Sequence, residues 1–132
     1  MSTGHEDYWY KYLTSHNIMG PEQSPWFAQG TKEVNPGVIA TFITYNVPEG
    51  YKLNITGGII SADLPGVNAV FFYVDDVLLW RLYFDLNIQL HFNPAAGHIL
   101  AAEQTLKLLV LCADADVKVL FEGALFGFEE KI

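Results

Sequence analysis

Cysteine is nearly absent from this 132-residue sequence. Cys112 is the only one, so the chain cannot form a disulfide within itself, and nothing in it requires an oxidising compartment. The residue ends the apolar run Leu-Leu-Val-Leu-Cys at residues 108–112. In such a run we expect a small buried hydrophobic residue rather than a reactive thiol.

Positive charge is also scarce. Arg81 is the only arginine, the lysines are scattered along the chain, and the net charge is −8. A protein that grips nucleic acid neutralises several phosphates with clustered Lys and Arg. Direct nucleic-acid binding is therefore disfavoured. The acidity keeps copies of the chain soluble, while buried apolar contacts can still drive the correct association.

Long uncharged hydrophobic runs are missing as well. The most apolar window, residues 67–82, is interrupted by Asn68, Asp75, Asp76 and Arg81, whereas a membrane-spanning helix needs about 20 apolar residues. The first residues contain no basic cluster followed by a long apolar run, so we expect no secretory signal peptide. We expect no membrane partner.

Motifs that carry enzyme chemistry are not found. The sequence has no G-x-S-x-G, H-E-x-x-H or C-x-x-C and no glycine-rich phosphate loop. His91 and His98 lie near Glu103, but Pro94 and Gly97 separate the two histidines, so we do not expect both rings to reach one metal ion. We therefore expect no catalytic site, no bound metal and no cofactor.

Paired carboxylates occur at Asp75-Asp76 and at Asp114 and Asp116, in segments that read as hairpin tips. Aspartate favours such turns, whereas a glycosidase needs two carboxyl groups that face each other across a cleft. We assign both pairs to turn formation. The alternative for the second pair is a weak Ca²⁺ site that includes Asp63, because oxygen ligands on loops suit calcium.

Apolar residues are what the chain has in excess. Hydrophobic residues make up 51% of the sequence and charged residues 17%, where a typical soluble domain has about a quarter charged residues. The length fits one domain, whose high ratio of surface to volume leaves too little interior for all this apolar material. We expect some of it to face a partner.

Residues 1–37 differ from the rest, because they mix turn formers with large aromatic side chains. We expect an irregular N-terminal arm, with a short helix over residues 6–13 as an alternative. Ordering some thirty residues costs on the order of 30 kcal/mol in backbone entropy, whereas full burial of the arm's apolar side chains contributes roughly 15–25 kcal/mol. The arm must therefore lie against its own domain or a neighbouring copy. Its expected anchors on a neighbour are Tyr8, Trp9, Tyr10, Tyr12, Trp26 and Phe27.

Residues 38–132 form the expected β domain, because the apolar period there changes to two. The segment 51–56 alternates without a fault, which indicates a strand with one buried face. The other expected strands lie at residues 39–45, 69–74, 77–84, 88–92, 106–108 and 117–128. A helix over residues 99–111 is disfavoured by Thr105 and Val110. The spacing predicts an all-β fold, a jelly-roll-like β-sandwich of about seven or eight antiparallel strands.

Two expected strands, residues 77–84 and 120–128, are apolar on both sides. A strand covered on one face only alternates. Each is therefore either a central strand whose outer face the N-terminal arm covers, or a subunit interface. We favour the interface, with Leu79, Trp80 and Tyr83 as its residues in the first strand.

Four segments resemble small jelly-roll structural proteins of bacteriophage virions. Residues 47–55 are similar to the strand entry V-P-x-G-k-x-l-x-I, and a short strand pair follows around residues 74–79. Residues 100–108 are similar to l-x-a-G-e-x-l-x-v, with Ala102 in place of the usual glycine, and residues 117–123 to the closing v-x-v-x-x-G. The similarity covers residues 38–128 and excludes the arm.

The resemblance implies a head decoration (cement) or tail-associated protein, commonly trimeric, assembled into the virion in the host cytoplasm. It implies as partners other copies of this chain and virion proteins such as the major capsid protein. The alternative is a carbohydrate-binding or receptor-recognition module, for which Trp80 and Tyr83 would form the aromatic platform.

Overall fold

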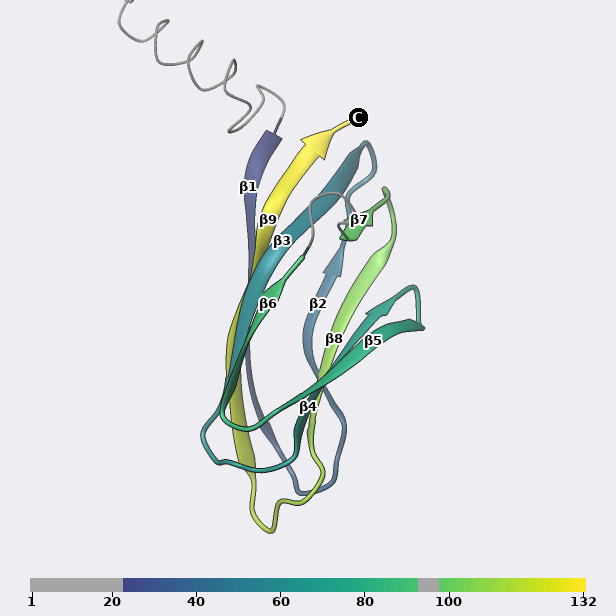
Figure 1. Cartoon of the computed structure of the whole chain (residues 1–132). Coiled ribbons are helices and arrows are strands. Elements are labelled where there is room, and N and C mark those ends of the chain that lie inside the picture. Colours follow the sequence, from purple (N-terminus) through teal and green to yellow (C-terminus); the bar gives the residue numbers. More distant parts are fainter. Residues whose placement is uncertain (1–22, 93–97) are drawn as a thin grey trace, which may run out of the picture.

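The fold is a sandwich of two antiparallel β-sheets (Figure 1). The computed structural model describes residues 23–92 and 98–132. The strands found there are β1 (Gln23–Val34), β2 (Ala40–Asn46), β3 (Tyr51–Ala62), β4 (Asn68–Val74), β5 (Val77–Phe84), β6 (Asn87–His91), β7 (His98–Leu100), β8 (Thr105–Cys112) and β9 (Val119–Lys131). Within these residues no helix is long and apolar enough to cross a membrane.

The strand order is that of a jelly roll. Sheet A has the order β1-β9-β3-β6, with β7 also paired to β3, and sheet B has the order β2-β8-β4-β5. The chain passes from one sheet to the other in the connections β1–β2, β2–β3, β3–β4, β5–β6, β7–β8 and β8–β9. The predicted jelly-roll sandwich is confirmed, and the strand at residues 105–112 rules out the competing helix there.

Alternation places the core between the sheets. In β8 the even-numbered residues from Leu106 to Cys112 are buried, and the odd-numbered residues on the other side are half-buried. A bulge between Thr41 and Ile43 breaks this rule in β2, so that Phe42 and Ile43 are both buried. Such a bulge inserts one extra residue into a strand and re-aims its side chains. Cys112 is buried, as expected.

The expected irregular arm through residue 37 is wrong for residues 23–34. These residues form β1, which pairs with β9 along its whole length, from Gln23 opposite Glu130 to Val34 opposite Val119. Pro25 and Gly30 suggested turns, but β1 is the edge strand of sheet A, where proline is tolerated because no ladder bond is needed on the solvent side.

Trp26 lies in the core, not at the interface predicted for it. Its side chain is 6% exposed, and its ring packs at 5.2 Å between centroids against Tyr45 of β2 in the opposite sheet. The Tyr45 hydroxyl donates a hydrogen bond of 2.7 Å to Glu129 of β9. These contacts join the two sheets where β1 and β2 meet.

Two turns use residues other than glycine at positive φ. Asp75 and Asp76 (φ 50° and 64°) form the two-residue connection between β4 and β5, a geometry that suits the twist of a hairpin. Glu103 (φ 69°) takes the left-handed position of the turn before β8. In the nine-residue pattern that residues 100–108 resemble, the glycine falls on this position and not on Ala102, so the departure from the pattern lies at Glu103.

Candidate interaction surface

Strand β5 is the most exposed apolar element of the described chain. It lies at the edge of sheet B, paired on one side with β4, and no described strand pairs with its other side. Most of its apolar side chains are exposed to solvent. They are Val77, Leu78, Leu79, Leu82 and Tyr83.

The edge position contradicts one of the two readings of residues 77–84. The alternative of a central strand covered on its outer face is wrong, because β4 is the inner neighbour and β5 ends the sheet. Segment 120–128 belongs instead to β9, a central strand between β1 and β3. Pairing on both sides does not cover the outer face of β9, which carries the exposed Phe126.

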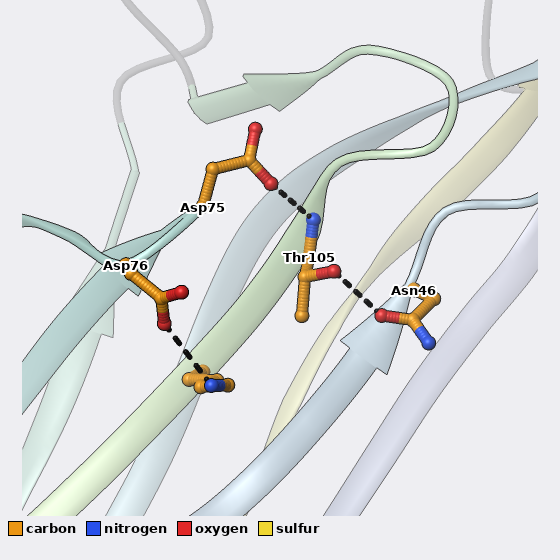
Figure 2. A network of polar contacts seen from close by, with 5 residues as sticks. Asn46, Asp75, Asp76 and Thr105 are labelled. Carbon is orange, nitrogen blue, oxygen red and sulfur yellow. Dashed lines mark hydrogen bonds and ion pairs between the residues drawn. The ribbon is translucent and has the colours of Figure 1, made fainter.

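Side chains at the tip of the β4–β5 hairpin hold β5 in place (Figure 2). Asp75 accepts a hydrogen bond of 2.9 Å from the backbone N–H of Thr105. It accepts another of 3.2 Å from the side chain of Gln104. The Thr105 hydroxyl donates to Asn46 at 2.7 Å. Lys107 forms an ion pair of 3.1 Å with Asp76. The tip is thus tied to β8 and, through Thr105, to β2.

The outer face of sheet B continues the apolar surface of β5. The strand register places Tyr83 of β5 beside Ala69 of β4, which lies beside Leu111 of β8. Ala69 is fully buried although it points outward, because its two neighbours cover it. We call the exposed β5 side chains together with Ala69, Leu111 and the neighbouring outward residues Phe71 and Leu109 the β5 surface.

Sheet A carries a second apolar patch on its outer face. The register sets Phe27 of β1 beside Phe126 of β9, and Phe126 beside Gly57 of β3. Both phenylalanines are exposed, as are Ile59 of β3 and Ile99 of β7. We call these four exposed side chains the sheet A patch.

The predicted interface residues divide into four groups. Phe27, Leu79 and Tyr83 are exposed, the first on sheet A and the other two on β5. Trp80 is half-buried and stacks on Phe72 with ring centroids 5.0 Å apart and an interplanar angle of 11°. Trp26 is in the core. Tyr8, Trp9, Tyr10 and Tyr12 lie outside the described residues.

A sugar platform needs aromatic rings on one face, and Trp80 and Tyr83 do not share one. The register places Trp80 opposite Phe72, which faces the core, and Tyr83 opposite Ala69, which faces outward. The two rings therefore point to opposite sides of β5. This geometry disfavours the expected carbohydrate platform at these residues.

Two of the carboxylates considered for calcium, Asp63 and Asp114, have protein partners in the loops. Asp114 accepts a hydrogen bond of 2.8 Å from the backbone N–H of Val67, which lowers the pKa of its carboxyl, with a smaller effect from the Cys112 thiol. Asp63 accepts a hydrogen bond of 2.9 Å from the N–H of Leu120. In the described ranges, no group of three or more His, Cys, Asp or Glu side chains is arranged to hold a metal ion. Burial raises the pKa of Cys112, as for a core thiol.

Sequence reasoning named the β5 strand but missed several of its residues. Val77, Leu78 and Leu82 are exposed like the predicted Leu79, at 40–59% of their surface, and the two-sided apolar pattern of residues 77–84 already contained them. Ile59 and Ile99 of the sheet A patch had no such signal, because each precedes a second apolar residue that is buried, Ile60 and Leu100, and the sequence does not say which of the two faces outward.

No family model matches the sequence, and no curated protein is similar to it. Some solved structures are similar in shape. A chain of the Bacillus endospore appendages, a family of disulfide-linked pili, is 8% identical with a TM-score of 0.49, over 83% of this chain and 90% of that chain. A chain of the infectious bursal disease virus Gx strain is 12% identical with a TM-score of 0.49, over 83% of this chain and 32% of that chain. The carbohydrate-binding module CBM36, in complex with calcium and xylotriose, is 14% identical with a TM-score of 0.44, over 81% of this chain and 98% of that chain. At these identities and scores, none of the three indicates a family or a function for this chain.

Proposed function

We propose that this chain is a non-enzymatic structural subunit of a virus particle, which associates with copies of itself and with neighbouring virion proteins through the β5 surface. The observation that carries the proposal is the exposed apolar edge of β5. Natural proteins normally shorten, charge or cover an edge strand, since its free backbone groups pair readily with another chain. Here the edge is eight residues long and carries one charged residue, Arg81.

The β5 surface is suited to a stable contact. Burying one exposed large apolar side chain contributes roughly 1.5–3 kcal/mol, and five such side chains stand on β5. A specific interface buries about 1,200–2,000 Å² in total, which is more than one strand provides. The adjoining outer face of sheet B supplies further apolar area, so strand pairing and face packing can act together.

The virion location is supported by the resemblance of residues 38–128 to jelly-roll proteins of bacteriophage particles. Decoration or cement of the head, or attachment to the tail, and a trimeric state belong to the same proposal. The jelly-roll strand order agrees with this role, since this fold occurs in viral capsid domains as well as in lectins and enzymes.

The association is tested with two matched variants of the full chain. Val77→Lys places a charge on β5, and Val117→Lys places the same charge on the loop before β9, where the valine is equally exposed (59% and 58%). We expect sedimentation to show an oligomer for the unmodified chain and for Val117→Lys, and a shift towards monomer for Val77→Lys. A monomer at all concentrations in the unmodified chain would falsify the proposal.

The virion location has a separate test. Purified particles of the virus that carries the gene should contain this chain in a fixed stoichiometry to the major capsid protein, measured by quantitative mass spectrometry. An oligomeric chain that is absent from such particles would keep the association and overturn the virion role.

A further inference from the structure

The outer face of sheet A contains a shallow groove of about 320 Å³. Its lining residues come from three adjacent strands, β3, β6 and β9. They include Gly57, Gly58, Ile59, Gln89, His91 and Phe126. The volume is at the lower end of the range for ligand sites, roughly 300–1,000 Å³, so the groove has room for one or two large side chains.

The groove exists because Gly57 has no side chain. A Cβ at this position would stand 2.8 Å from the ring of Phe126 and 3.1 Å from the carbonyl oxygen of Leu90, closer than such atoms pack. The Phe126 ring therefore lies against the backbone of β3, and a hollow is left between this ring, Ile59 and His91. A larger residue at 57 would push the ring outward and fill the hollow.

The groove and the sheet A patch form one apolar area that lacks a described cover. Phe27 and Phe126 lie beside each other, 61% and 43% exposed, and Ile59 borders the groove on its other side. A peptide segment laid across this face would cover the apolar side chains.

The N-terminal segment joins sheet A within reach of this area. Residues 1–22 precede Gln23, the first residue of β1, which lies opposite Glu130 at the end of β9. The register then leads from Glu130 to Lys52 of β3, five residues before Gly57. Two strand spacings and five residues along the strand give a separation of roughly 19 Å between Gln23 and the groove.

The chain length allows the aromatic cluster to reach the groove. Tyr12 is eleven residues before Gln23, and an extended chain of that length spans about 36 Å. Tyr8, Trp9 and Tyr10 are a few residues further away. All four side chains have the flat, amphipathic form that packs well on an apolar surface and keeps its polar atom at the rim.

We propose that the chain's own N-terminal segment binds across the outer face of sheet A and places an aromatic side chain of the Tyr8–Tyr12 cluster in the Gly57 groove. The same chain is favoured over a second copy because the tether holds the segment at an effective concentration in the millimolar range. This contact is separate from the β5 surface, which stays free for assembly.

The test follows trypsin cleavage after Lys11 in the full chain. Ile59→Ser and Phe27→Ser each remove one side chain of the sheet A patch, and Val117→Ser, on the loop before β9 and outside both apolar surfaces, is the matched control. These side chains are 46%, 61% and 58% exposed, so all three variants are expected to keep the fold. Losing part of one apolar contact should raise the cleavage rate about fivefold in the first two variants, and leave it unchanged in the control.

A synthetic peptide of residues 1–22 supplies the unprotected rate. Cleavage of the full chain as fast as the peptide, or equal protection in all four proteins, would overturn the proposal. If the protection of Lys11 disappears on dilution, the segment that covers the face belongs to a second copy, and the proposed binding within one chain is wrong. An intact oligomer with an unprotected segment would contradict this inference alone, and a monomer with a protected segment would contradict only the β5 assembly.

Discussion

Tyr45 and Glu129 carry a side-chain hydrogen bond between the two sheets. Burial is the main cause that raises the pKa of Tyr45 to about 12, and the hydrogen bond to the Glu129 carboxylate and its negative charge add to the effect. The neutral phenol is thus favoured in the folded protein. Because the ordinary tyrosine pKa is about 10, the stabilisation is complete below pH 10 and is lost as the pH rises from 10 to 12.

We predict that Tyr45→Phe removes this pH dependence. At neutral pH the variant should lose about 1 kcal/mol of unfolding free energy, because Glu129 loses its donor. Above pH 10 the difference from the unmodified chain should shrink, since the phenol that has to ionise is absent. Urea unfolding at pH 7 and at intervals up to pH 12 measures both effects, and a constant difference over this range would contradict the assignment.

Asp75 and Asp76 have the same residue type and similar backbone angles but different partners. Asp75 accepts hydrogen bonds from the Thr105 N–H and from Gln104, whereas Asp76 has an exposed ion pair with Lys107. Exposed ion pairs contribute little, about 0–1 kcal/mol. The adjacent positions therefore form a matched pair of test sites.

Asp75→Ala should destabilise the chain by about 1–2 kcal/mol more than Asp76→Ala, because an unpaired backbone N–H at Thr105 is the extra loss. Aspartate adopts positive φ more readily than alanine, and both variants lose this advantage. It therefore cancels when the unfolding free energies of the two variants are compared. Thermal unfolding of the two proteins side by side is the measurement. Equal stabilities would show that Asp75 does not hold the hairpin tip.

At the scale of the elements, β9 is constrained on both sides, because it pairs with β1 on one side and β3 on the other. Gly127 lies between Trp26 of β1 and Ile55 of β3. A Cβ at this position would overlap the backbone carbonyl oxygen of Asn54, which cannot move without separating the strands. The absence of a side chain is required here by close approach.

Gly127→Ala should therefore cost about 2–3 kcal/mol of unfolding free energy, in the range of overpacked cores. Ser61→Ala, on the exposed side of the neighbouring strand β3, is the control and should change stability by less than about 0.5 kcal/mol. Denaturant titration distinguishes the two. A neutral Gly127→Ala would mean that β9 and β3 lie further apart than the structure shows.

At the scale of the whole molecule, charge and apolar surface oppose each other. Copies with a net charge of −8 repel one another, whereas the β5 surface attracts. Salt reduces the repulsion, since the Debye length falls from about 30 Å at 0.01 M to about 3 Å at 1 M. Apolar contacts are not screened in this way.

The self-association constant should therefore rise when the salt concentration is raised over that range. An interface held mainly by ion pairs would behave in the opposite way. Sedimentation equilibrium at several NaCl concentrations measures the trend, with Val77→Lys as the variant whose association should be weak throughout. A fall in association with salt would contradict an apolar β5 contact.

Much of the fold was predictable because alternation and turn residues are local signals. The strands at residues 39–45, 69–74 and 77–84 were expected close to where β2, β4 and β5 lie. The positions of the hairpin tips followed from Asp, Asn, Pro and Gly. The β1 strand was not predicted, because Pro25 and Gly30 look like turn residues unless the strand is known to stand at an edge.

The sequence alone determined the β class, the turns and the surplus of apolar residues, since these depend on the order of neighbouring residues. The tertiary structure decided where the surplus lies. Only the pairing of distant strands puts β5 at an edge and β9 in a sheet interior, turns Trp26 towards Tyr45, and opens the groove beside Gly57. Pairing partners are chosen by non-local packing, and no local pattern records that choice.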